Sequence, residues 1–196
     1  MMVNMSKRAE RAAHTQAKLR KAAIKVFARK GFHETKISDI VAEAGVSQPA
    51  FYLYHDSKEA LFETLVSEFR SELREATRQC LISPGLNPDL LYEDLRQSFM
   101  RFLTVLCRDR DLTEMSFFQT FSGEATKVQM LEWIALNMER EQQAGILRGD
   151  ISVRYQARLV LGILDQMSRI AERDQDVEEL AGVCARLFCD ALASKH

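Results

Sequence analysis

Apolar residues recur at helical spacing along most of the chain, and no stretch alternates apolar and polar residues as a half-buried strand does. The first such pattern covers residues 15–30, where Leu19, Ala23 and Phe27 share one face and lysines occupy another, before Gly31 ends it. This segment is predicted to be an amphipathic helix. Because the pattern continues to the C-terminus, the sequence predicts an all-α fold.

The same periodicity predicts a long helix from Lys58 to about Leu81, which would join the N-terminal helices to the rest of the chain. Two prolines and a glycine break the pattern at 83–88, and glycines mark a second loop at 145–150. Further helices are predicted over 90–107, 111–121, 124–144, 153–172 and 177–193, which gives about nine helices in total.

Between residues 37 and 58 the pattern changes to two short helices. Ile37, Ile40 and Ala44 recur at helical spacing, and Gly45 can adopt the left-handed conformation that ends a helix. Thr35 is a natural N-cap for this first helix. A short helix followed by a tight turn is therefore predicted here.

The second short helix begins at Gln48. Ser47 can cap its N-terminus, and Pro49 suits its first turn because the N–H that proline lacks has no helical partner there. Phe51 and Tyr54 would form its apolar face. Two short helices joined in this way have the layout of a helix-turn-helix.

The residues left on the outer face of this second helix suit a nucleic acid. A recognition helix presents its N-terminal residues to base edges in the major groove. Gln48 can make a bidentate contact to adenine, and Pro49 or Ala50 can pack on a thymine methyl group. The hydroxyl groups of Tyr52 and Tyr54 can reach phosphates. The sequence therefore predicts a DNA-reading surface.

Charge supports this prediction, although the formal net charge is only -1. Residues 1–60 hold eleven Lys and Arg against six Asp and Glu, whereas the remaining residues hold sixteen against twenty-two. The basic part coincides with the helix-turn-helix, as expected of a module that faces phosphates. Within it, Lys58 and the free main-chain N–H groups of its helix would act as a phosphate clamp.

Residues 1–13 are polar and basic, and we expect a flexible arm. Lys7, Arg8 and Arg11 would contact the DNA backbone or the minor groove. A solvated tail without a partner is the alternative for this segment.

Several motifs in fixed order resemble the TetR family of bacterial repressors. They are the run A-A-x-x-x-F-A-x-x-G-F at 22–32, Thr35, the segment 40–47 that ends in A-G-V-S, then F-Y-x-Y at 51–54 and S-K-E-x-L-F at 57–62. Two features depart from the family pattern. Val41 stands where the family usually has alanine, and Gln48-Pro49-Ala50 replaces a basic-small-hydroxyl triplet, so the bases read cannot be copied from a typical member.

The resemblance implies a three-helix DNA-binding domain at 14–64 and a larger helical domain for ligand binding and dimerisation at 65–196. It also implies that Thr35 contacts a phosphate. Together with polar and basic residues of the same domain, the expected DNA-binding set is Lys18, Thr35, Lys36, Ser47, Gln48, Pro49, Ala50, Tyr52, Tyr54 and Lys58.

The middle helices are dense in aromatic and methionine side chains. Such a stripe is often plain core, but members of the resembled family bind small molecules between the corresponding helices, so a site for an apolar or aromatic effector is expected. Arg101, Gln119 and Gln166 are the nearest polar candidates. The expected pocket residues are Phe99, Phe102, Leu103, Met115, Phe118, Phe121, Trp133, Met138 and Leu164.

The last two helices are apolar on more than one face, which calls for a second subunit as cover. By resemblance these helices would form a four-helix interface with their symmetry mates, and Gly162 and Gly182 would allow close approach. A homodimer sets two recognition helices ~34 Å apart, which predicts a palindromic operator. The expected interface residues are Leu161, Met167, Leu180, Leu187 and Phe188.

The sequence has no apolar run long enough to span a membrane and no signal peptide, so we expect a cytoplasmic protein. The four cysteines match neither a zinc spacing nor a disulfide framework, which favours buried reduced thiols over a redox pair. No cofactor is expected.

The function predicted is a ligand-responsive, homodimeric DNA-binding repressor; an activator with the same fold remains open. The alternative function is that of an all-α enzyme or a metal-binding helical protein without DNA binding. The candidate metal site for it would combine His33 and Glu34 with His55 and Asp56. A third reading is a helical partner-binding module. No nucleophile elbow, H-E-x-x-H or phosphate-binding glycine loop occurs in the sequence.

Overall fold

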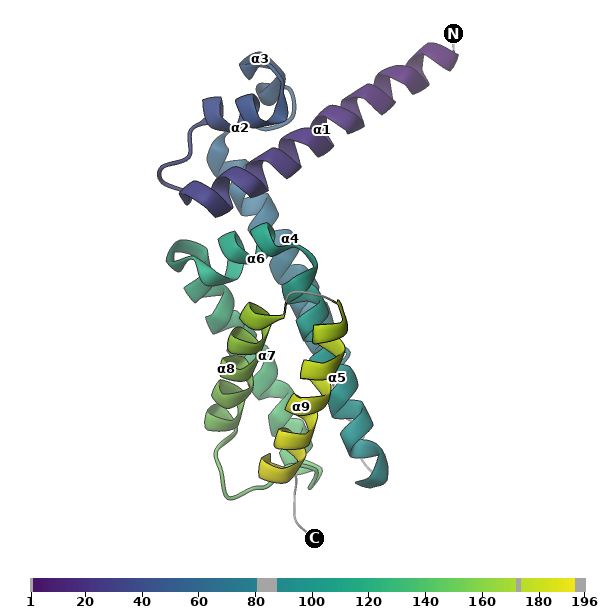
Figure 1. Ribbon diagram of the computed structural model, residues 1–196, viewed down its shortest axis with the longest axis vertical. Helices are drawn as coiled ribbons and strands as arrows, with labels where there is room; N and C mark the ends of the chain where they lie inside the picture. The colour runs from purple at the N-terminus through teal and green to yellow at the C-terminus, as the bar shows by residue number, and fades with distance from the viewer. Residues whose placement is uncertain (1, 81–87, 172–173, 193–196) are drawn as a thin grey trace. The chain divides into compact units, whose positions relative to one another are not determined.

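A computed structural model describes residues 2–80, 88–171 and 174–192 (Figure 1). The described residues form nine α-helices and one turn of π-helix, with no strand, so the all-α prediction is confirmed. They divide into two compact units. The first contains residues 1–69 and 111–123, and the second contains residues 70–110 and 124–196.

The N-terminal stretch of the first unit is built from four helices. They are α1 (Met2–Lys30), α2 (Ile37–Ala44), α3 (Gln48–Tyr52) and the N-terminal part of α4 (Lys58–Arg78). Leu19, Phe27, Ile40, Phe51 and Phe62 are at most 2% exposed and form its core. Burial of these large apolar side chains is what holds the short helices α2 and α3, because helices of eight and five residues are not stable alone.

Helix α1 begins at Met2, so the expected flexible arm at 1–13 is helical over its described residues. Alanines and other strong helix formers fill this segment, and the buried second half of the helix provides the nucleus from which it extends. In Figure 1 this first half of α1 projects beyond α2 and α3. None of the side chains from Lys7 to Lys18 is buried.

The segment Asp111–Gly123 packs with the first unit rather than with its neighbours in sequence. It holds most of α6 (Arg110–Thr113), the π-helical turn Glu114–Phe118 and the start of α7 (Thr120–Gln143), where the sequence predicted one helix over 111–121. Gly123 lies against this turn so closely that an added Cβ would be 2.3 Å from the carbonyl oxygen of Phe117. The close approach explains why the position is a glycine.

The second unit contains the rest of α4 and α7 together with α5 (Pro88–Arg108), α8 (Val153–Ile170) and α9 (Asp174–Leu192). Helix α5 packs along α9 and α8, and α8 also contacts α9. Leu103, Leu106, Met130, Leu164 and Ala185 are fully buried at its centre. The apolar faces that the sequence predicted for these helices are therefore used to build a helical core.

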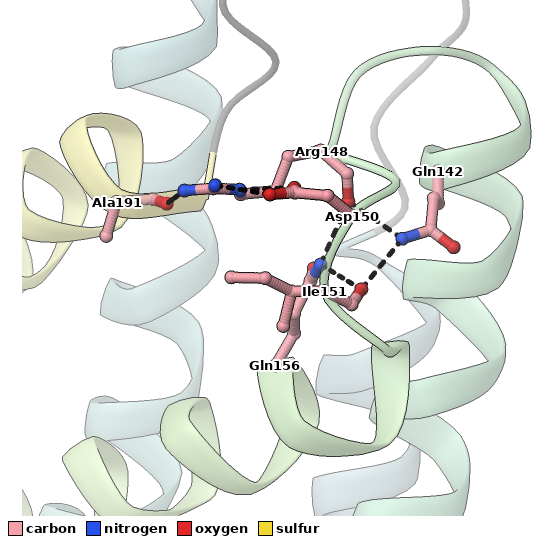
Figure 2. A network of polar contacts seen from close by, with 6 residues as sticks. All are labelled: Gln142, Arg148, Asp150, Ile151, Gln156 and Ala191. Atoms are coloured by element: carbon pink, nitrogen blue, oxygen red, sulfur yellow. Dashed lines mark hydrogen bonds and ion pairs between the residues drawn. The ribbon is translucent and has the colours of Figure 1, made fainter.

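The connection from α7 to α8 is fixed by side-chain amides (Figure 2). The Nε2 of Gln142 donates to the carbonyls of Arg148 and Ile151, at 2.8 and 3.1 Å, and the Nε2 of Gln156 donates to the same two carbonyls. Arg148 also pairs with Asp150 and donates to the carbonyl of Ala191 in α9. The last turn of α7 is therefore held in one position.

Two predicted boundaries differ from the structure. We expected the domains to divide between residues 64 and 65, whereas the first unit continues to Phe69 and takes in 111–123. Helix α4 ends at Arg78. The predicted loop at 83–87, Leu81 and residues 172–173 lie outside the described residues. A charged turn was expected at 172–176 between the last two helices, but its final three residues form the start of α9, which begins at Asp174.

Candidate nucleic-acid interface and interior cavity

The helix-turn-helix is formed as the sequence predicts. Gly45 has a φ of 66° and its N–H donates to the carbonyl of Ala42, while the N–H of Val46 donates to the carbonyl of Val41 at 3.0 Å. These bonds close the end of α2, and Ser47 takes the extended conformation of an N-cap before α3.

Helix α3 buries one residue and exposes most of the others. Phe51 is 0% exposed, whereas Gln48 and Pro49 are exposed and Tyr52 is 52% exposed. Ala50 and Tyr54 are half-buried. The predicted base-facing residues Gln48 and Pro49 are therefore accessible at the start of a helix that is anchored by a single phenylalanine.

Lys58, which was predicted to clamp a phosphate, uses two of its three N–H groups within the first unit. Its Nζ donates to the carbonyls of Phe32 and Thr35, at 3.0 and 2.9 Å, and lies 4.4 Å from the centre of the Phe32 ring. An ammonium has three N–H groups, so one remains. Ser57 already caps α4 by accepting a hydrogen bond from the N–H of Ala60. Lys58 therefore fastens the loop between α1 and α2 to the start of α4.

Thr35 is not the N-cap of α2, because Lys36 occupies that position. The hydroxyl of Thr35 donates to the carbonyl of Gly31 at 2.7 Å, and the residue is only 1% exposed. The side chain of Asp39 accepts a hydrogen bond from the N–H of Lys36 instead. The role that the family resemblance implied for Thr35, a phosphate contact, is not available to its buried hydroxyl group.

A shallow groove of about 440 Å³ crosses this face of the first unit. It brings together the start of α2, the first residue of α3 and the start of α4, and its lining residues are Thr35, Lys36, Ile37, Ser38, Gln48, Lys58 and Glu59. Lys36, Ser38 and Gln48 are exposed in it. The groove therefore combines two lysines with the N-terminus of the reading helix, which suits a sugar-phosphate backbone.

Helix α1 adds a basic stripe. Spacings of four and three residues place Lys7, Arg11, His14, Lys18 and Lys21 on one side of the helix, and all five are exposed. Lys25 continues the stripe and pairs with Glu43 of α2 at 2.5 Å, which places the stripe on the α2 side of α1. Lys18 was predicted to contact DNA, and in the structure it is one of several exposed basic side chains in this stripe.

The π-turn segment is anchored to the end of α1. The Nε2 of Gln119 donates to the carbonyls of Phe27 and Ala28. The ring of Phe121 stacks on that of Phe32 at a centroid distance of 4.8 Å and an interplanar angle of 2°. Gln119, a polar candidate for effector binding, is therefore engaged within the first unit.

The second unit contains a cavity of about 60 Å³ among α4, α5, α7, α8 and α9. Three of the nine expected pocket residues line it, namely Phe99, Phe102 and Met138. The full lining is Thr77, Cys80, Leu95, Ser98, Phe99, Phe102, Ile134, Asn137, Met138, Glu141, Val160 and Phe188.

The other six expected pocket residues lie elsewhere. Met115, Phe118 and Phe121 belong to the first unit, and Phe121 is 52% exposed. Leu103 and Leu164 are fully buried core residues, and Trp133 is half-buried. The density of aromatic and methionine residues in the sequence could not distinguish cavity residues from core residues, because it does not show which unit each helix belongs to.

Sequence reasoning missed the polar members of the cavity. Asn137 and Glu141 are four residues apart on α7 and share a face with Ile134 and Met138. Glu141 is only 6% exposed. Polar residues on an otherwise apolar helical face were the signal that could have found them.

An apolar stripe remains uncovered on the last two helices. Tyr155, Leu159 and Ile170 of α8 are 68, 56 and 61% exposed, and Leu187 of α9 is 57% exposed. Of the expected interface residues, Met167 and Leu180 are half-buried, whereas Leu161 and Phe188 are buried within the unit. Gly162 is exposed, whereas Gly182 is buried, and a Cβ added to it would lie 3.3 Å from the hydroxyl of Tyr92 on α5.

All four cysteines are free thiols, and burial raises the pKa of each of them. The pKa of Cys184 reaches about 11. Because the thiolate is the reactive form, these thiols are poorly suited to redox chemistry. Among the described residues no group of three His, Cys, Asp or Glu side chains could hold a metal ion.

The two histidines of the metal hypothesis pack against rings. His33 contacts Phe32 and Phe121, and His55 contacts Phe51. The Nε2 of His55 is buried without a hydrogen-bond partner. Burial lowers the pKa of His55, and the nearby Asp56 opposes that shift in part.

No helix in the described ranges is both long and apolar enough to cross a bilayer. A family model described as bacterial regulatory proteins of the tetR family matches residues 19–65. The chain is 32% identical over 154 residues to an uncharacterized HTH-type transcriptional regulator, YdgC, of Bacillus subtilis strain 168, covering 79% of each chain.

Two further comparisons agree. The HTH-type transcriptional repressor NicS of Pseudomonas putida strain KT2440 is 25% identical, with 76% of this chain and 73% of that protein covered. The crystal structure of the TetR family regulator PfmR from Thermus thermophilus superposes with a TM-score of 0.69 at 23% identity, covering 87% of this chain and 92% of that one. With its helix-turn-helix in place and a relative of this identity over most of its length, the chain belongs to the tetR family of bacterial transcriptional regulators, which bind DNA.

Proposed function

We propose that the protein is a homodimeric repressor that leaves a palindromic operator when a small apolar or aromatic effector enters the cavity of the second unit. The observation that carries this proposal is the division of α3 into one buried residue, Phe51, and an exposed edge formed by Gln48, Pro49 and Tyr52. A helix with that division is held rigidly while its first turn is presented to a major groove.

The surrounding groove supplies the rest of a duplex-binding surface. Lys36 and the remaining N–H of Lys58 lie beside Gln48, so backbone contacts and base contacts come from one face. The basic stripe of α1, from Lys7 to Lys21, extends the positive surface along the unit. Phosphate contacts from these lysines would position the helix, and Gln48 would read a base pair.

Dimerisation is supported by the uncovered stripe of α8 and α9. Tyr155, Leu159, Ile170 and Leu187 expose large apolar side chains, and a second copy of the same stripe would cover them. Two copies related by a two-fold axis would present two α3 helices. A spacing of ~34 Å between them matches one turn of DNA and calls for an operator with two-fold symmetry.

Repression and release by an effector are supported by the relatives and by the cavity. One relative is named a repressor. The cavity is lined mainly by apolar side chains, including Phe99, Phe102 and Phe188. Suppose that the dimer has two states, and that only one of them can span both half-sites of the operator. A ligand that prefers the other state would lower the DNA affinity by the difference between its binding free energies for the two states, typically ~1–3 kcal/mol.

Binding to duplexes from the region upstream of the protein's own reading frame tests the proposal. We expect a specific complex of two chains per duplex, measured by gel shift and fluorescence anisotropy. The logarithm of the affinity should fall linearly with the logarithm of the salt concentration, by ~0.9 for each phosphate contact. An affinity that barely responds to salt, or one chain per duplex, would contradict it.

A further inference from the structure

We propose that the effector carries a positively charged, hydrogen-bond-donating head group, an alkylammonium or arylammonium, that is held by Glu141 at the polar end of the cavity. This inference rests on the proposed function in one respect, which is that the cavity of the second unit is the effector site. It adds the chemical class of the ligand to that proposal.

The cavity has two chemically different parts. One part is a wall of apolar side chains from four helices: Leu95, Phe99, Phe102, Ile134, Met138, Val160 and Phe188. The other part comes from the end of α4 and the turn after it, from α5 and from α7, and is formed by Thr77, Cys80, Ser98, Asn137 and Glu141. A ligand that fills the space must therefore be amphipathic, with an apolar body and a polar end.

Most of the donors at the polar end are already in use. The hydroxyl of Thr77 donates to the carbonyl of Leu73 at 2.8 Å, and the Nδ2 of Asn137 donates to the carbonyl of Thr77 at 2.8 Å. The thiol of Cys80 approaches the carbonyl of Ser98 at 3.7 Å. The hydrogen bond from Asn137 to the carbonyl of Thr77 fixes which way the Asn137 amide points, because a carbonyl oxygen can only accept and must face the NH2 group. The side-chain oxygen of Asn137 is therefore left as an acceptor.

Glu141 is the one ionisable carboxyl group among the lining residues, and it is 6% exposed. A carboxylate has about four acceptor positions, so it can accept from a ligand in addition to any protein donor. A ligand ammonium would donate a charge-assisted hydrogen bond to this carboxyl group, and such bonds are stronger than those between neutral groups. A ligand carboxylate would instead place a like charge beside it.

The position of Glu141 is fixed by its main chain. Its carbonyl oxygen accepts hydrogen bonds from the N–H groups of Ile146 and Leu147, at 2.9 and 3.4 Å. The next residue, Gln142, is tied to the carbonyls of Arg148 and Ile151 in the network of Figure 2. The main chain that carries this carboxyl group is therefore held at the end of α7 by several hydrogen bonds, which favours a specific rather than an adaptable contact.

An arginine lies near the polar end of the cavity. Arg101 interacts with the thiol of Cys80, but it does not line the cavity. Phe99, Phe102 and Phe188 line the cavity, and a cation held over the face of an aromatic ring is attracted to it. The volume of about 60 Å³ corresponds to about four to six groups the size of a water molecule, so the ligand is compact.

Calorimetric titration of the full-length protein, without DNA, tests this assignment with three probes of equal chain length: pentylamine, 1-pentanol and pentanoate. Near neutral pH the amine is charged. We expect pentylamine to bind more tightly than pentanol and pentanoate to bind least. Glu141→Gln should lower the affinity for pentylamine by about tenfold or more and leave that for pentanol within about threefold.

Glu139→Gln is the matched control, because it removes the same charge from an exposed position on the same helix and should leave all three affinities unchanged. If Glu141→Gln does not fold, the preference of the unaltered protein for amine over carboxylate still decides. Pentanoate binding as tightly as pentylamine, or no binding of pentylamine, would overturn the inference while DNA binding through α3 stood. Pentylamine that binds through Glu141 without altering DNA affinity would leave the head-group assignment intact and refute the effector role.

Discussion

The side-chain amide of Gln119 donates a hydrogen bond to the main-chain carbonyl of Ala28 across 2.8 Å. It also reaches the carbonyl of Phe27 at 3.1 Å, so one side chain serves two carbonyls near the end of α1. The stack of Phe121 on Phe32 lies beside these bonds. A segment that is distant in sequence, 111–123, is thereby made part of the DNA-binding unit, although the chain on both sides of it belongs to the second unit.

Gln119→Ala should loosen this segment. Loss of the two hydrogen bonds should lower the free energy of unfolding by about 1 kcal/mol, because the carbonyls of α1 can still be reached by water. Denaturant unfolding measures the change, and hydrogen exchange should show faster exchange in the segment 111–123. Gln143→Ala, at an exposed position on α7, is the control and should change neither quantity. Equal stability of the two variants would show that the bonds are not formed in solution.

The buried Nε2 of His55, which has no hydrogen-bond partner, predicts a pH dependence. Burial lowers its pKa from the ordinary value of 6.5, so the folded protein binds this proton less readily than the unfolded chain. The contribution to stability is complete above about pH 6.5 and is lost as the pH falls from there toward the lowered pKa. His55→Phe keeps a ring against Phe51 and should flatten this dependence. Thermal unfolding on both sides of pH 6.5 measures it.

The exposed His14 provides the control for that experiment. His14→Phe should leave the acid side of the stability profile as it is in the unaltered protein. If the His55 variant were as acid-sensitive as the unaltered protein, the loss of stability would have to come from other groups.

Local signals were enough to predict much of the fold. Helix α2 has the predicted bounds, and Gly45 adopts the left-handed conformation that was expected from its place after Ala44. The start of α8 at Val153 also agrees. These features depend on spacing, capping and glycine conformation, which are properties of a few neighbouring residues.

The features that the sequence did not predict depend on distant partners. Lys58 was expected to face an anion, but the carbonyls of Phe32 and Thr35 take two of its N–H groups. Periodicity cannot show the loop that supplies those carbonyls. Similarly, the sequence shows apolar residues on two faces of α9 but not which face is buried. In the structure Phe188 packs against Phe99 of α5 and is buried, whereas Leu187 is exposed.

The uncovered stripe predicts the oligomeric state. Leu187→Asp places a charge at the centre of the proposed contact and should give monomers, because an unpaired charge cannot be buried there without a large cost. Light scattering coupled to gel filtration measures the mass. Leu136→Asp, on α7 at 50% exposure, makes the same chemical change elsewhere and should remain dimeric. Dimers of the Leu187 variant would refute this interface.

The basic stripe of α1 predicts a change in salt dependence. A triple variant, Lys7→Gln, Arg11→Gln and Lys18→Gln, should weaken binding to every duplex and make the salt dependence less steep by ~0.9 for each phosphate that is no longer neutralised. Fluorescence anisotropy over a range of salt concentrations measures both effects. Three exposed arginines of the second unit, changed together, serve as the control: Arg140, Arg154 and Arg186. An unchanged slope in the α1 variant would identify the stripe as a solvated face.

The exposed edge of α3 predicts a division of roles between two residues. Gln48→Ala should lower the affinity for the preferred operator by ~1–3 kcal/mol and relax preference at one base pair in each half-site, because the variant cannot make the bidentate hydrogen bonds to a base. Tyr52→Phe removes only a hydroxyl that is expected on a phosphate, so it should weaken binding to all sequences by a similar factor. Selection from a randomised duplex library measures both profiles side by side. The opposite result is that the tyrosine variant changes the preferred sequence while the glutamine variant does not. That result would show that Tyr52 reads a base and Gln48 contacts a phosphate, so α3 would enter the groove in a different orientation from the one that its buried Phe51 favours.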